Sequence, residues 1–99
     1  MESFDSRVIL LAPQDNCVAV AATLAAGTRL LIDGTIVLIE RDIGIGHKLA
    51  RREIARGEKI LKYGAIIGSA TQPIARGAHI HLHNLVSDYL PTYTLPPAG

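Results

Sequence analysis

The sequence predicts a mainly β domain with short helical turns at most. Three observations favour this fold class: a repeated glycine turn, an Asp-Gly dipeptide between apolar runs, and the lack of any long helical stripe of apolar residues. The pattern apolar-x-x-Gly-x-x-apolar occurs at residues 24–30, 43–49, 54–60 and 74–80. A glycine at this offset is typical of a tight turn with positive φ that leads into a strand. The long, short, long spacing of the four copies indicates two related halves.

The strands follow from the apolar alternation and from the turn residues between them. We expect them at residues 8–12, 17–21, 29–32, 35–40, 47–50, 59–63, 66–70 and 79–85. Asp33-Gly34 predicts a type I′ hairpin, because both residues tolerate positive φ. Gly64 and Gly68 indicate bends, and residues 51–56 have room for one helical turn. Residues 1–88 are expected to form the domain, and residues 89–99, which contain three prolines, a Pro-rich tail.

The composition limits the classes of function. The chain has 99 residues and is 48% hydrophobic, so it can form one small core but hardly a deep cleft of its own. Ten Lys and Arg against nine Asp and Glu give a net charge of +1, which disfavours nucleic acid and membrane surfaces as partners. No apolar run approaches the ~20 residues of a membrane span. The single Cys17 is expected to be a packing residue, and its use fits the cytoplasm.

Three histidines alternate with apolar residues near the end of the chain. On a strand, His79, His81 and His83 share one face while Ile80 and Leu82 share the other. Neighbouring histidines of this row lie roughly 6.5 to 7 Å apart, so at most two can bind one metal ion. The alternative is that the imidazoles bond only to neighbouring strands or to water.

Other polar residues are expected at the rim of the domain, where sites form. His47 and Lys48 follow a glycine turn, and Lys62-Tyr63 precede the bend at Gly64. A lysine can pair with a carboxylate, and a histidine can serve as donor or base. The simpler alternatives are solvated lysines and an edge tyrosine. Asn84 either orients a neighbouring histidine or contacts substrate.

Four segments together resemble a known family. They are DNCVAV (15–20), GHKLA (46–50), IARGEKILKYGAIIGSA (54–70) and IARGAHIHLHNL (74–85). They resemble, in the same order, the N-terminal domain of altronate and galactarate dehydratases and the small subunit of sulfolactate sulfo-lyase. The resemblance implies a SAF domain with the β-clip fold. It also implies a lyase that acts on a 2-hydroxy acid, with a divalent metal such as iron, and whose large catalytic domain lies outside these 99 residues.

We therefore expect the small subunit of a sugar-acid hydro-lyase that completes or covers the active site of a separate large subunit. The alternatives are a non-catalytic SAF module that binds carbohydrate or protein and, third, a small metal-binding protein. The expected roles are catalytic for His47, Lys62 and His81, substrate-binding for Lys48, Tyr63, His83 and Asn84, and metal-binding for His81 and His83. Association into homo-oligomers is also expected, because open strand edges tend to pair.

Overall fold

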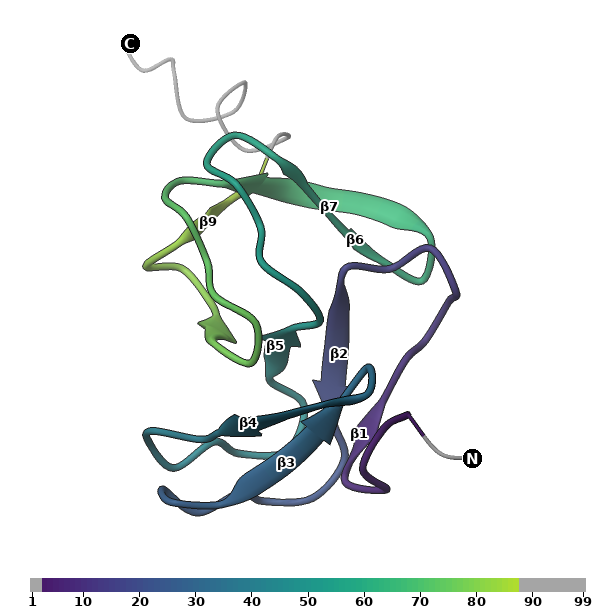
Figure 1. Cartoon of the computed structure of the whole chain (residues 1–99). Coiled ribbons are helices and arrows are strands. Elements are labelled where there is room, and N and C mark those ends of the chain that lie inside the picture. The colour runs from purple at the N-terminus through teal and green to yellow at the C-terminus, as the bar shows by residue number, and fades with distance from the viewer. Residues whose placement is uncertain (1–2, 88–99) are drawn as a thin grey trace, which may run out of the picture.

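A computed structural model describes residues 3–87 of the chain, and this part is built from strands and turns alone (Figure 1). The strands are β1 (Val8–Ile9), β2 (Cys17–Val20), β3 (Arg29–Ile32), β4 (Thr35–Leu38), β5 (Lys48–Ala50), β6 (Lys59–Lys62), β7 (Ala65–Ala70), β8 (His79–Ile80) and β9 (Leu85–Val86). All the strand pairs are antiparallel. Over residues 3–87 no helix is long and apolar enough to cross a membrane. The Pro-rich tail at residues 89–99 lies outside the described residues.

The strands form three sheets, with the orders β1-β2-β5-β8, β3-β4 and β6-β7-β9. In Figure 1 the β3–β4 and β6–β7 hairpins lie at opposite ends of the molecule, and β2 and β5 lie between them. The predicted mainly β class is therefore confirmed. Residues 51–56 form no helical turn, because Ile54 makes an isolated bridge to Ile74 instead.

The repeated glycine turn has the predicted structure. The four glycines, Gly27, Gly46, Gly57 and Gly77, have φ of 92°, 90°, 85° and 82°, and each comes two residues before a strand. The apolar residues that open the pattern pair within each half, Leu24 with Ile43 and Ile54 with Ile74. The apolar residues that close it have 0% exposure, and these are Leu30, Leu49, Ile60 and Ile80. The pattern thus encodes both the turns and the centre of the core.

Both long hairpins use the same two-residue turn. Asp33 and Gly34 have φ of 52° and 81° and join Ile32 to Thr35, as expected for a type I′ turn. Tyr63 and Gly64, with φ of 57° and 74°, join β6 to β7 in the same way. The predicted bend at Gly68 corresponds to a register shift between Ile60 and Leu61 on the partner strand.

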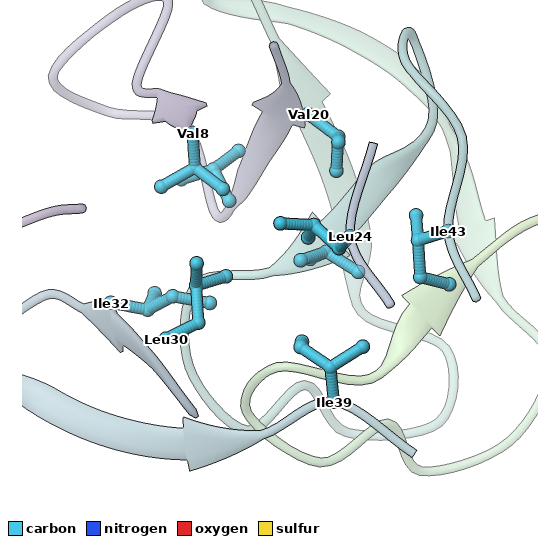
Figure 2. Close-up of a cluster of buried hydrophobic side chains, with 9 residues drawn as sticks. Val8, Val20, Leu24, Leu30, Ile32, Ile39 and Ile43 are labelled. Carbon is cyan, nitrogen blue, oxygen red and sulfur yellow. The ribbon is translucent and has the colours of Figure 1, made fainter. Parts of the chain in front are cut away.

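The β1-β2-β5-β8 sheet has a hydrophobic cluster on each of its two faces. Neighbouring residues on a strand point to opposite faces, so β2 and β5 contribute to both clusters. Val18 and Leu49 belong to the first cluster, part of which is labelled in Figure 2, whereas Cys17 and Ala50 belong to the second. The first cluster collects the apolar residues around β3–β4, and the second those around β6–β7. Each repeat half therefore has its own core, and the central sheet joins them.

The predicted strand at residues 79–85 is wrong in its middle. β8 ends at Ile80, residues 81–84 form a turn, and β9 begins at Leu85. Asn84 closes this turn, because its side-chain oxygen accepts from the backbone N–H of His81 (2.9 Å) and its amide donates to the carbonyl of His79 (2.9 Å). Ile80 is buried as predicted, but Leu82 is 79% exposed and does not pack inward.

Candidate active site at the histidine cluster

Four histidines gather where β5 and β8 begin. His47 directly precedes β5, and His79 is the first residue of β8, where it pairs with Leu49. Nε2 of His79 lies 2.9 Å from Nδ1 of His47, a hydrogen-bond distance. The turn closed by Asn84 brings the His81 ring to 5.5 Å from the rings of both His47 and His79. The His83 ring lies 5.8 Å from the His79 ring.

The predicted grouping of histidines is therefore present, but it arises by a different route. A straight strand would space the three rings along one line, whereas the turn folds His81 and His83 back around His79. His47 comes from the other half of the chain and joins the cluster through the β5–β8 pairing. Asn84 is 5% exposed, and its hydrogen bonds to the backbone of His81 and His79 hold the turn that carries the histidines.

His79 is the central and most perturbed member of the cluster. Burial, followed by the charges of His47, Arg41, His81 and His83, lowers the pKa of His79 from 6.5 to about 4. Its Nδ1 is buried and has no hydrogen-bond partner among the described residues. A neutral imidazole with a free ring nitrogen can accept a proton or bind a metal ion.

Three of the histidines fit a metal site. His47, His79 and His81 each offer a ring nitrogen, and these atoms all lie within 4.8 Å of one another. Two nitrogens at right angles on an ion with ~2.1 Å bonds lie about 3 Å apart, close to the 2.9 Å between His79 and His47. Of the two predicted ligands, this group contains His81, while His83 lies beside it.

A cavity of about 250 Å³ adjoins the cluster. His79, His83 and Asn84 line one part of it, and the apolar side chains include those of Leu38 and Ile43. Two cationic residues that the sequence reasoning did not single out, Arg41 and Arg76, also line it. No motif contains Arg41. A comparison of the two halves would have drawn attention to it, because the equivalent position in the second half holds Gln72.

The remaining predicted site residues lie elsewhere. Lys48 pairs with Ile80 and Ala19 and therefore faces away from His79, since directly paired residues share a face. Lys48 and Lys62 both lie near Cys17, on the other face of the sheet. Burial and then the charge of Asp15 raise the pKa of the Cys17 thiol to about 11, and the two lysines oppose this rise. Tyr63 is 70% exposed at the tip of the β6–β7 hairpin.

Comparison with known proteins identifies the family. The altronate/galactarate dehydratase SAF domain matches residues 6–88, which is most of the chain. The chain belongs to this SAF domain family. Altronate dehydratase of Escherichia coli (strain K12) is 43% identical over 70 residues, which cover 71% of this chain and 14% of that protein. Altronate dehydratase of Bacillus subtilis (strain 168) is 39% identical over 84 residues, covering 85% of this chain and 16% of that protein.

A second group of relatives is shorter. The (2R)-sulfolactate sulfo-lyase subunit alpha of Chromohalobacter salexigens is 49% identical over 43 residues, which cover 43% of this chain and 46% of that subunit. The SAF chain described here thus spans about one seventh of the altronate dehydratases it matches. Both groups of relatives carry the names of lyases.

Proposed function

We propose that this SAF domain is the small subunit of a sugar-acid hydro-lyase and completes the active site of a separate large subunit. The observation that carries the proposal is the cluster of four histidines beside a cavity. Membership of the dehydratase SAF family supports it, as does the similarity to a sulfo-lyase subunit alpha. The site is open on one side, where His81, Leu82 and His83 are exposed, and a large subunit would cover it there.

The chemistry required is the loss of water from a 2-hydroxy acid. A base removes the proton next to the carboxylate, and an acid protonates the departing hydroxyl group. We assign these steps to His47 and His81, whose rings flank the neutral His79 at the edge of the cavity, outside its lining. His83 contacts substrate, and Asn84 holds the turn. The cavity lining does not contain Lys62, Lys48 or Tyr63. Their predicted roles in catalysis and substrate binding therefore require that the substrate or the large subunit contacts the surface on which these residues lie.

A divalent metal such as iron belongs to the same proposal. His47, His79 and His81 would hold it, in place of proton transfer by His47 and His81, because their ring nitrogens converge and the low pKa of His79 keeps that ring neutral. When bound, such an ion polarises an oxygen of the substrate as a Lewis acid. The 2.9 Å between Nε2 of His79 and Nδ1 of His47 supports this assignment, because two ligand nitrogens on one ion lie at about this separation.

Reconstitution with the large subunit tests the proposal. The chain alone should show no appreciable dehydration of altronate or galactarate, and mixing it with a large dehydratase subunit should restore turnover. In the complex, His81→Ala and His83→Ala should each reduce kcat by at least about 10²-fold, the scale for a lost acid, base or positioning group. Arg56→Ala is the control, because Arg56 is exposed and lies outside the lining of the cavity.

Two results would contradict the proposal. Turnover by the chain alone at ~1 s⁻¹ or more would show that no large subunit is needed. Full activity of both histidine variants in an assembled complex would remove the catalytic role and favour the alternative, a non-catalytic SAF binding module. Metal analysis of the variants separates the roles of the histidines: loss of metal identifies a ligand, and retained metal with lost turnover identifies a proton-transfer or substrate contact.

A further inference from the structure

The cavity beside the histidine cluster has the features of an anion site. We propose that it contains a carboxylate-binding subsite in which Arg41 pairs with the carboxylate of a small hydroxy acid. The choice of a hydroxy acid rests on the proposed function, but the binding of a carboxylate rests on the cavity itself. This subsite lies within the chain, so it should bind its ligand without a large subunit.

The lining of the cavity combines one apolar wall with a few polar groups, as small-molecule sites usually do. Leu38 and Ile43 belong to the apolar part. The polar part contains two cations, Arg41 and Arg76, one carboxylate, Glu40, and the imidazoles of His79 and His83. Its volume of about 250 Å³ lies just below the ~300 to 1,000 Å³ of sites for drug-sized ligands. It therefore suits a small acid of up to about six carbons.

Arg41 is available for an incoming anion. In the described part of the chain the ion pairs are Arg7–Asp5, Arg51–Asp33 and Arg52–Glu58, and none includes Arg41. The neighbouring Asp42 accepts a hydrogen bond from the backbone N–H of Ala26 at 2.9 Å. The other cation of the lining, Arg76, donates from Nη1 to the carbonyl of Arg51 at 2.9 Å. Among the described residues, the Arg41 side chain has no ion pair and no hydrogen bond like that of Arg76. Its planar guanidinium can therefore bind a carboxylate through two parallel hydrogen bonds.

The backbone around Arg41 is fixed on both sides. Ile39 is 2% exposed, and its carbonyl accepts from the N–H of Gly27 at 2.7 Å. Ile43 is 3% exposed and exchanges two backbone hydrogen bonds with Leu24. Because the backbone on both sides of Arg41 is fixed, less conformational entropy is lost when a ligand orders its side chain.

The relation between the two halves gives independent support. Ala70 and Ile74 occupy the positions of Ile39 and Ile43 in the second half, with the same backbone bonds. The segment between them is Thr71-Gln72-Pro73, where the first half has Glu40-Arg41-Asp42. The fold therefore does not require an arginine here. The cation occurs in the copy of this loop that lines the cavity with His79.

The position of Arg41 also suits the chemistry of the histidines. His79 is affected by burial first, by His47 second and by the positive charge of Arg41 third, so the guanidinium lies within electrostatic reach of the ring. A carboxylate held at Arg41 places the adjoining carbon and hydroxyl group of a short acid toward His79 and its neighbours. The subsite thus orients the substrate for the proton transfers assigned above.

A binding experiment on the full chain in metal-free buffer tests this subsite. The probes are D-gluconate, a six-carbon hydroxy acid, and sorbitol, its uncharged counterpart, each titrated into labelled protein and followed by NMR. We expect saturable shifts with gluconate at His83, Asn84 and the backbone near Arg41, and none with sorbitol. Arg41→Gln should weaken gluconate binding at least about 10-fold, the scale of one charge-assisted hydrogen bond. Arg41→Lys should bind with intermediate affinity.

The control is Arg56→Gln, which makes the same change of charge on an exposed residue outside the cavity lining. Equal shifts with gluconate and sorbitol, unchanged affinity of Arg41→Gln, or no saturable shift would each overturn the subsite. Arg41 is exposed, so its variants should fold, and their spectra verify this. If gluconate binds as expected while the reconstituted complex shows no dehydratase activity, the subsite stands and the proposed function fails.

Discussion

Two buried polar residues, Asp15 and Asn84, each hold a turn of the fold. Asp15 is 2% exposed, and its carboxylate accepts from the backbone N–H groups of Tyr63 (2.8 Å) and Gly64 (2.7 Å). Asn84 does the same for the turn at residues 81–84. Asp15 is distant in sequence from the turn that it holds, whereas Asn84 is the last residue of its own turn. Both side chains satisfy backbone groups that have no strand partner in the turn. Asn84 in this way fixes the backbone that carries His81 and His83.

The half-buried imidazole of His79 predicts a pH dependence of stability. Its pKa falls from 6.5 to about 4 on folding, chiefly through burial, so the unfolded chain binds more protons between these values. The free energy of unfolding should therefore fall as the pH is lowered from 6.5 to about 4. Urea denaturation of the metal-free chain across this range measures the effect, and His79→Gln should show a smaller fall. An NMR titration in which the His79 ring titrates at or above its ordinary pKa would contradict this account.

At the scale of the elements, the four glycine turns differ in their surroundings. A Cβ at Gly46 would meet no atom within 4 Å, whereas a Cβ at Gly77 would lie 2.7 Å from Cγ2 of Val37 on β4. Alanine at either position costs about 1 to 2 kcal/mol for the left-handed backbone. Gly77→Ala should cost a further ~1 to 3 kcal/mol for overpacking against the other half of the chain.

The stabilities of Gly46→Ala and Gly77→Ala, measured by chemical denaturation, test this difference. Val37→Ala provides a second variant, because it removes the two Cγ atoms but leaves Cβ, which would lie 2.9 Å from the new methyl group. The extra cost of Gly77→Ala should therefore shrink in the Val37→Ala background without vanishing. Equal losses of stability for Gly46→Ala and Gly77→Ala in the parent chain would show that the β3–β4 hairpin moves away from the new methyl group without cost.

The elements were largely predictable from local sequence signals, and the site was predictable only in part. The glycine pattern and Asp33-Gly34 act within a few residues, so the sequence alone was sufficient to locate the turns and strands. The prediction of a strand over residues 79–85 was wrong because the Asn84 side chain bonds to the backbone of His79 and His81. These bonds compete with the backbone hydrogen bonds of a strand pair. The meeting of His47 with His79, and the cavity lined by Arg41, depend on the pairing of β5 with β8, which no local pattern specifies.

At the scale of the whole molecule, the site lies where the two halves meet. His47 belongs to the first half and His79, His81 and His83 to the second, and the cavity likewise draws residues from both. The two hydrophobic clusters share strands β2 and β5, since alternate residues of these strands face opposite ways. The site geometry therefore depends on both cores being intact.

This arrangement predicts that the two halves unfold together. Leu30 and Ile60 occupy equivalent positions in the two copies of the pattern, and both have 0% exposure. Leu30→Ala and Ile60→Ala should each lower the free energy of unfolding by about 2 to 5 kcal/mol. Because each core rests on the same central strands, each variant should still unfold in a single transition, with the calorimetric enthalpy equal to the van't Hoff enthalpy. Amide hydrogen exchange tests the coupling of the two halves more directly. Leu30→Ala should speed exchange in the distant β6–β7 hairpin as much as in the β3–β4 hairpin. If protection persists in β6–β7 while β3–β4 exchanges freely, the halves are independent units and the central sheet does not couple them.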